Sequence, residues 1–276
     1  RLSISISFIK LIISPLVLLI LGFLFFDSGI GGISILNELT NELTKENFVY
    51  LSDNLNCPYG NKSVQEIINL SLKNCHKLVE LNCKMIIVAC NTSTTNSISI
   101  LRNNIDIPII GVEPGIKPAI NYTKTNNIGV LATEKTLGSK LFFNTSKNNN
   151  ITNIKIHEQV GYMLVEKIEK GLINNKSVEG YLKKYLSKML KNNIDCLVLG
   201  CTHYNFLINQ IKKIIPENIK LIDTITPIIT HVKKTISKYK IASDSNYNGI
   251  IKVFYNGKTL NKEFLKKRYL IEYLDF

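Results

Sequence analysis

The strongest constraint on the fold is an internal repeat in which two apolar runs each end in a cysteine. Residues 85–92 read Met-Ile-Ile-Val-Ala-Cys-Asn-Thr, and residues 196–203 read Cys-Leu-Val-Leu-Gly-Cys-Thr-His. The two terminal cysteines, Cys90 and Cys201, are 111 positions apart. We therefore expect two similar halves. Each would present one thiol at the carboxyl end of a buried strand, and the two thiols would face each other across a shared cleft.

Apolar runs alternate with amphipathic stretches along the whole chain, which is typical of βαβ units and a mostly parallel sheet. We expect an α/β protein with two similar α/β domains, mostly parallel sheets, a pseudo-two-fold relation and an active site in the interdomain cleft. The expected strands are 22–26, 48–52, 85–89, 108–112, 128–132, 151–156, 196–200 and 219–222. The expected helices are 31–43, 63–81, 93–103, 116–122, 136–144, 160–171, 178–192, 204–214 and 226–238.

Breaks in the pattern predict where the chain crosses between domains. Gly and Pro interrupt regular structure at 113–117, and a second crossing should follow Asp223. The first domain is then formed by 22–114 and 224–276, and the second domain by 115–223.

Residues 1–21 form an apolar leader. The uncharged run 11–26 resembles a membrane or signal segment, but its end must supply the first strand. The remainder is much shorter than the roughly 20 residues of a spanning helix. We expect the leader to lie outside the fold and to be dispensable, with a membrane anchor as the alternative.

The charge balance is strongly basic but poor in arginine. Lys and Arg total 34 against 21 acidic residues, a net charge of +13, yet Arg occurs only at positions 1, 102 and 268. Arg usually dominates base reading and bidentate phosphate contacts. We therefore expect solvated lysines and no nucleic-acid partner. A basic nucleic-acid-binding protein on an inactive enzyme scaffold remains the non-enzymatic alternative.

The six cysteines show no Cys-x-x-Cys pair and no zinc-ligand spacing, so we expect no metal site. A domain of this size needs no disulfides, which favours a reducing, cytoplasmic location. Cys75, Cys83 and Cys196 fall within helical or strand patterns and are expected to be buried. Cys57 precedes a Pro-Tyr-Gly turn and could line the cleft; we assign it no chemical role.

Two glycine-containing turns fall at expected strand ends, where ligands bind in open α/β sheets. The first, 26–32, reads Phe-Asp-Ser-Gly-Ile-Gly-Gly. Its Asp27 could orient a thiol or an ammonium group, and Ser28 could donate a hydrogen bond. The second contains Tyr59 and Gly60, which could point amides and a phenol into a cleft. Taken alone, the first segment reads equally well as a structural turn, and the second is better read as a surface turn.

A thiol is a useful carbon-acid base only as the thiolate, so it needs a neighbouring base or a helix N-terminus. Cys90 is followed by Asn91 and Thr92, and Cys201 by Thr202 and His203. His203 could relay a proton. Two thiols on opposite sides of one substrate could remove a proton from one face and return it to the other, without metal or cofactor. The polar neighbours, with Ser28, would hold the substrate carboxylates.

The ordered set Phe-Asp-Ser-Gly-x-Gly-Gly, Asp-Asn-x-x-x-Pro-Tyr-Gly-x-Lys-Ser, Val-Ala-Cys-Asn-Thr, Leu-Ala-Thr and Leu-Gly-Cys-Thr-His-Tyr resembles the glutamate racemases of the aspartate/glutamate racemase family. The resemblance covers about 25–223. It implies a cytoplasmic enzyme that makes D-glutamate for peptidoglycan without pyridoxal phosphate. It also implies that Cys90 and Cys201 are the catalytic pair, assisted by Asp27 and His203. The matching substrate-binding residues are Asp27, Ser28, Tyr59, Gly60, Asn91, Thr92, Thr202 and His203.

The chain departs from the family pattern at a few positions. Gly161 and Tyr162 stand where many members have Cys-Pro before the helix with a supporting glutamate. That glutamate is expected to be Glu169, with Glu166 as the alternative. Other readings are an aspartate racemase, another isomerase of this fold, or a decayed enzyme. The expected partner is glutamate, with no membrane partner; a homodimer is compatible with the sequence, which does not give the oligomeric state.

Overall fold

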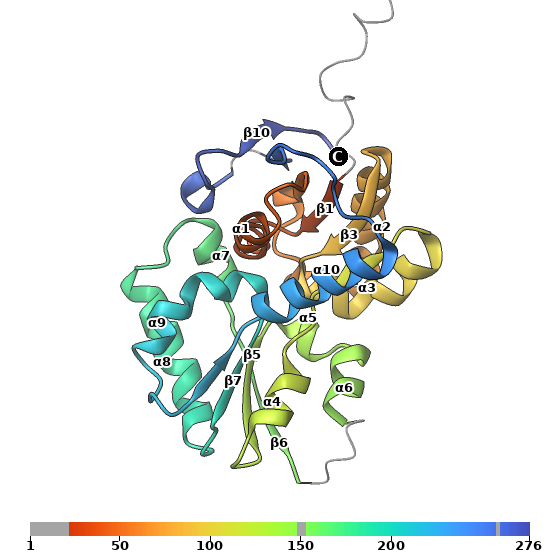
Figure 1. The fold of residues 1–276 in the computed structure, drawn as a ribbon. Helices are drawn as coiled ribbons and strands as arrows, with labels where there is room; N and C mark the ends of the chain where they lie inside the picture. The colour runs from red at the N-terminus through yellow and green to blue at the C-terminus, as the bar shows by residue number, and fades with distance from the viewer. Residues whose placement is uncertain (1–21, 148–152, 258–259) are drawn as a thin grey trace, which may run out of the picture.

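The described residues, 22–147, 153–257 and 260–276 of a computed structural model, form two sheets flanked by helices (Figure 1). The six-stranded sheet has the order β10-β9-β2-β1-β3-β4. Its strands are β1 (Gly22–Asp27), β2 (Phe48–Ser52), β3 (Cys83–Val88), β4 (Ile109–Gly111), β9 (Ile251–Tyr255) and β10 (Leu270–Tyr273). The four-stranded sheet has the order β6-β5-β7-β8. Its strands are β5 (Asn127–Ala132), β6 (Lys155–Val160), β7 (Cys196–Gly200) and β8 (Lys220–Ile222).

Helices connect successive strands, as parallel pairing requires. The α-helices are α1 (Ile33–Glu42), α2 (Val64–Glu80), α3 (Asn91–Asn104), α4 (Ile116–Tyr122), α5 (Glu134–Leu137), α6 (Lys140–Lys147), α7 (Leu164–Glu169), α8 (Lys176–Leu190), α9 (Ile208–Lys212) and α10 (Ile225–Tyr239). Short 3₁₀ helices are η3 (Asn54–Asn56), η4 (Tyr59–Asn61), η5 (Thr202–Leu207) and η6 (Lys262–Phe264). None of these described helices is long and apolar enough to cross a bilayer.

The sequence repeat corresponds to a repeat of topology. The order β2-β1-β3-β4 in one sheet matches β6-β5-β7-β8 in the other, and every described strand pair is parallel. Cys90 and Cys201 follow β3 and β7, which hold equivalent places next to the first strand of each half. The expected α/β class, with two similar halves and mostly parallel sheets, is confirmed.

The apolar strands are buried on both faces, which is why they read as continuous hydrophobic runs. Along β1, Phe23 and Phe25 enter one core cluster together with Tyr50, while Leu24 and Phe26 enter another on the opposite face. The first of these clusters also contains residues of β7, so the two sheets share apolar packing. This continuous core holds the carboxyl ends of the strands in fixed positions.

Several expected elements differ from the structure. The strand expected at 151–156 lies later in the chain, as β6 (Lys155–Val160). The expectation rested on the isoleucines in 151–156, but β6 is an edge strand, where polar residues are tolerated. The helix expected at 160–171 is only α7, because Gly161 packs against Tyr204 and Met163 has a φ of 64°. The helix expected at 136–144 is divided into α5 and α6, and 204–214 begins as the 3₁₀ helix η5.

The C-terminal segment contains strands that the pattern did not predict. Strand β9 pairs with β2, and β10 extends the same sheet, which Figure 1 shows as dark blue elements above the red and orange ones. The domain limits after 114 and after 223 stay predictions. The leader 1–21 lies outside the described residues.

Candidate active site

Cys90 lies at the junction of β3 and α3, as the N-cap residue of that helix. Its sulfur accepts a hydrogen bond from the amide of Ser93 over 3.4 Å, and its thiol donates to Ser28 Oγ over 3.7 Å. The side chain is buried. Burial, and then the charge of Asp27, raise the pKa of the Cys90 thiol to about 12. The protein therefore holds this cysteine as a protonated thiol at neutral pH.

Cys201 occupies the equivalent position after β7, but its proton partner is different. Its sulfur lies 3.8 Å from Nδ1 of His203, and Nε2 of the same ring lies 2.6 Å from Oε1 of Glu169. Cys201 and His203 are buried, and the Glu169 side chain is mostly buried. Thiol, imidazole and carboxylate therefore form a relay along which a proton can move.

Glu169 is held at the end of α7 by groups from the other half of the chain. The amide of Ile30 donates to Oε1 over 2.8 Å, and the side chain of Asn54 donates to Oε2 over 3.3 Å. Glu166, the alternative considered from the sequence, instead accepts a hydrogen bond from the exposed side chain of Asn61. The structure thus brings Glu169, and not Glu166, to His203.

The imidazole of His203 is buried, and opposing effects act on its pKa. Burial by itself would lower its pKa. The hydrogen bonds to Cys201, Cys57 and Glu169, together with the charge of Glu169, nevertheless raise the pKa well above its usual value. A protonated ring facing a carboxylate is a stable resting state for this relay.

Asp27 stands between the two cysteine sites. Its carboxylate accepts hydrogen bonds from the Ser28 hydroxyl at 3.1 Å, the Gly29 amide at 3.3 Å and the Thr202 hydroxyl at 3.0 Å. Burial raises its pKa, although the charge of His203 and the Thr202 bond act in the opposite direction. The Asp27 carboxylate therefore contacts both Ser28, the hydrogen-bond partner of Cys90, and Thr202, the residue after Cys201.

A group of small polar side chains surrounds the thiols. The side-chain amide of Asn91 donates to Val112 O, while its buried Oδ1 has no hydrogen-bond partner among the described residues. The Thr92 hydroxyl lies 2.9 Å from Thr133 and 3.2 Å from Thr136. Neither Thr133 nor Thr136 was predicted from the sequence to be a site residue. The signal was present, because Thr133 follows the end of β5 as Ser28 follows β1.

The Tyr59–Gly60 segment approaches the site through its backbone. The Tyr59 phenol is buried, donates to Asp53 over 2.6 Å and accepts from Asn74 over 3.0 Å, so its hydroxyl is already engaged. Gly60 lies against Thr133: a Cβ atom there would be 3.0 Å from the threonine Cβ. A cavity of about 150 Å³ adjoins this contact and is lined by residues of the 58–61, 133–134 and 160–166 segments.

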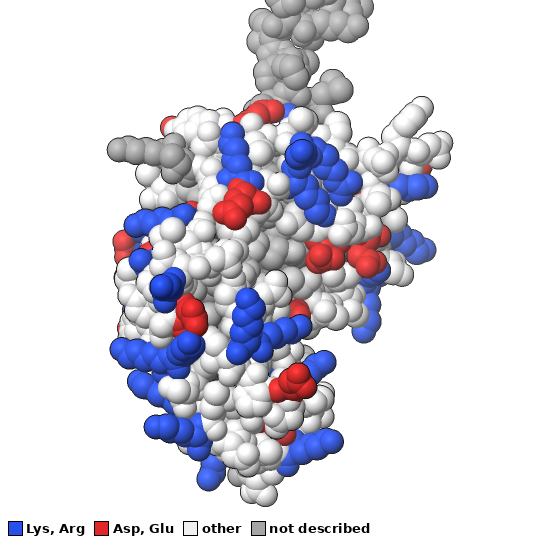
Figure 2. Space-filling model, turned by 90° about the vertical axis from the view of Figure 1, so that its left-hand side faces the viewer, with Lys and Arg blue, Asp and Glu red and all other residues white. Residues whose placement is uncertain are grey.

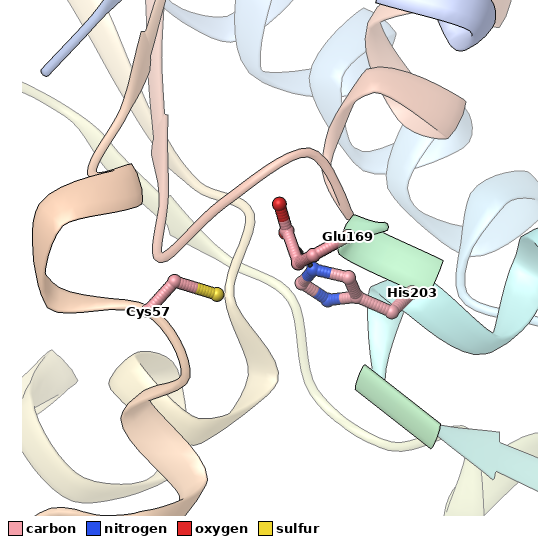
Figure 3. Close-up of side chains that lie close together, drawn as sticks. All are labelled: Cys57, Glu169 and His203. Atoms are coloured by element: carbon pink, nitrogen blue, oxygen red, sulfur yellow. Dashed lines mark hydrogen bonds and ion pairs between the residues drawn. The ribbon is translucent and has the colours of Figure 1, made fainter. Parts of the chain in front are cut away.

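Cys57 is part of the site, which the sequence alone left undecided. Its sulfur points toward His203 and Glu169 from the loop before η4 (Figure 3). One ligand atom of each of these three residues lies within 4.8 Å of the others. Burial raises the pKa of the Cys57 thiol to about 12, with the His203 contact acting against it. The three thiols that were expected to be buried, Cys75, Cys83 and Cys196, are confirmed as buried.

The structure thus places two thiols at equivalent strand ends, one near a carboxylate and one near an imidazole–carboxylate pair, and groups of these kinds can transfer protons. Comparison with known proteins agrees: residues 34–232 match the model of the Asp/Glu/Hydantoin racemase family. The chain belongs to this family.

Its relatives include curated and solved glutamate racemases. The chain is 42% identical over 212 residues to the glutamate racemase of Ralstonia pickettii, covering 77% of this chain and 75% of the relative. A solved glutamate racemase from Bacillus anthracis superposes with a TM-score of 0.84 at 30% identity, covering 92% of this chain and 97% of that one. The Francisella tularensis glutamate racemase, solved with D-glutamate, gives a TM-score of 0.80 at 28% identity, with the same coverage.

Proposed function

We propose that this chain interconverts L- and D-glutamate without a cofactor, by acid–base chemistry at Cys90 and Cys201. The observation that carries the proposal is the equivalent placement of the two cysteines after β3 and β7, each with its own proton partner. Racemisation needs this arrangement, because the proton must leave one face of the α-carbon and return to the other.

The reaction balances with the two thiols alone. One cysteine, as a thiolate, takes the α-proton and becomes a thiol. The opposite cysteine, as a thiol, gives its proton to the other face of the carbanion and becomes a thiolate. For the reverse direction the protonation states exchange. His203 and Glu169 can accept or supply the proton of Cys201, and Asp27, through Ser28, can do the same for Cys90.

The carbanion must be stabilised by preorganised donors, which act strongly in a buried site. The start of α3 supplies amides, and the hydroxyls of Ser28, Thr92 and Thr202 are buried at the same place. The unpartnered Oδ1 of Asn91 can accept a hydrogen bond from the substrate ammonium group. The hydroxyls suit the two carboxylates of glutamate.

We also propose that the product serves peptidoglycan synthesis and that the protein works in the cytoplasm. All six cysteines are free thiols, and a disulfide at either reacting thiol would stop the reaction. D-glutamate bound to the Francisella relative supports glutamate as the small-molecule partner.

The basic net charge does not favour a nucleic-acid partner. On the face shown in Figure 2, Lys and Arg side chains are scattered, and Asp and Glu side chains lie between them. A binding protein for nucleic acid would concentrate its charge in one patch or stripe.

The proposal is tested by following circular dichroism of L-glutamate and of D-glutamate with the purified protein and no added cofactor. Both signals should decay to zero. L-aspartate, in a parallel reaction, should turn over far more slowly. Faster turnover of aspartate would make the chain an aspartate racemase, and an unchanged glutamate signal would contradict the proposal.

A further inference from the structure

A third thiol lies beside the proton relay of Cys201 and has no part in the reaction proposed above. Cys57 comes from the loop between η3 and η4, Glu169 from the end of α7, and His203 from η5. Figure 3 shows the Cys57 sulfur directed at the imidazole, with the Glu169 carboxylate beside the same ring. The ligand atoms of these three side chains all lie within 4.8 Å of one another.

The composition of this cluster suits zinc. Zn²⁺ takes thiolate, imidazole and carboxylate ligands in a tetrahedron, with bonds of about 2.0–2.3 Å. Those bonds separate ligand atoms by about 3–4 Å. The His203–Glu169 pair must therefore open from 2.6 Å, and any pair near the 4.8 Å limit must close, each by about 1 Å. Thiolate and imidazole also select zinc over magnesium or calcium, which prefer oxygen ligands.

The cluster is held in place by the surrounding structure. The Ile30 amide and the Asn54 side chain hold the Glu169 carboxylate, and the Cys201 sulfur lies 3.8 Å from Nδ1 of His203, on the opposite side of the ring from Glu169. Gly29 keeps space open between the ligands, because a Cβ atom there would collide with Glu169 and lie 3.0 Å from the Cys57 sulfur. The spacing of cysteines in the sequence gave no sign of this site, because its residues come from three distant segments.

We propose that Cys57, Glu169 and His203 bind Zn²⁺ and that the bound ion inhibits racemisation. Binding replaces the hydrogen-bonded proton between His203 and Glu169 with the metal, and both that proton and the Cys57 thiol proton are released to solvent. The ion then occupies the groups that Cys201 needs for proton exchange. Inhibition rests on the proposed function, whereas metal binding does not.

The test measures binding and inhibition separately in wild type, Cys57→Ala and the control Cys83→Ala. Cys83 is a buried thiol in β3 that belongs to a different core cluster. Zinc affinity is measured by competition with a chromophoric chelator, in a phosphine reductant that replaces thiols. Wild type and the control should bind one ion per chain, and Cys57→Ala should bind it at least tenfold more weakly. Zinc should inhibit glutamate racemisation in wild type and the control at concentrations at least tenfold lower than in Cys57→Ala, and a chelator should restore activity.

Equal zinc affinity in wild type and Cys57→Ala would overturn the proposal, as would loss of binding in the control alone. Equal affinity is the result expected if zinc binds only to Cys90 and Cys201. Cys57→Ser serves as a second variant if the alanine variant fails to fold, because a serine hydroxyl keeps the shape but is a poor zinc ligand; it should show the same loss. If wild type has no racemase activity, the proposed function fails, while the binding comparison still decides the site.

Discussion

Thr202 donates a hydrogen bond to Asp27 over 3.0 Å, joining residues that are 175 positions apart in the chain. Asp27 ends β1 in one half, and Thr202 follows Cys201 in the other. This buried bond ties the carboxylate near Cys90 to Thr202, the residue after Cys201, and so joins the two halves of the site.

Replacing Thr202 with Val should weaken this tie without changing the side-chain volume. A hydrogen bond to a charged group contributes about 1.5–3 kcal/mol, so we expect kcat/KM for glutamate to fall by roughly tenfold to a hundredfold. Because the Thr202 bond lowers the pKa of Asp27, that pKa should rise further. Thr235→Val is the control and should keep its activity, because Thr235 is a buried threonine of α10 whose hydroxyl donates to His231 O. Equal effects in both variants would mean that the bond has no special role.

Replacing Glu169 with Gln should lower the pKa of His203. The carboxylate raises that pKa through its hydrogen bond and its charge, and the amide keeps the shape without the charge. The imidazolium should therefore lose its proton at a lower pH, and any loss of activity that follows this ionisation should shift to lower pH with it. NMR titration of the His203 ring measures the shift directly. Glu166→Gln, which changes an exposed contact, should leave the titration unchanged.

A methyl group at Gly31 should displace His203. A Cβ atom at this position would collide with the imidazole and lie 2.7 Å from the Thr202 hydroxyl, whereas one at Gly180 in α8 would meet nothing within 4 Å. Gly31→Ala should thus lose most of its racemase activity. Gly180→Ala should keep full activity and gain about 0.5–1 kcal/mol in the free energy of unfolding, as expected for alanine in a helix interior. Steady-state rates and urea unfolding of both variants check the pair.

The buried thiols should make the fold sensitive to alkali. Burial raises the pKa of Cys75 and raises that of Cys83 to about 12. In the unfolded chain these thiols ionise near their ordinary pKa, so the unfolded state loses protons first as pH rises, and stability falls. Each such thiol should cost about 1 kcal/mol per pH unit between the two pKa values. Urea unfolding of Cys75→Ala from pH 8 to 10.5 should show a shallower decline than wild type; parallel curves would refute this origin.

The apolar strands and the two cysteine segments could be predicted from the sequence because strands buried on both faces read as continuous hydrophobic runs. The ends of strand β6 could not be predicted, since an edge strand needs fewer apolar residues. Strands β9 and β10 were not predicted, because the C-terminal segment was expected only to return to the first domain. Glu169 could be favoured by resemblance, but only the structure brings it to His203. Cys57 meets Glu169 and His203 only because three segments distant in the sequence come together in space, and no local sequence pattern predicts such a contact.

The central claim is that two thiols act on opposite faces of one α-carbon, and proton exchange in D₂O tests it most directly. L-glutamate is incubated with the enzyme, and NMR and chiral chromatography follow deuterium at the α-carbon in each enantiomer at early times. The account predicts that D-glutamate carries solvent deuterium while the remaining L-glutamate keeps its proton, and that neither Cys90→Ser nor Cys201→Ser racemises. Early exchange in unreacted L-glutamate at the rate of product formation, or full racemisation by Cys90→Ser, would contradict it.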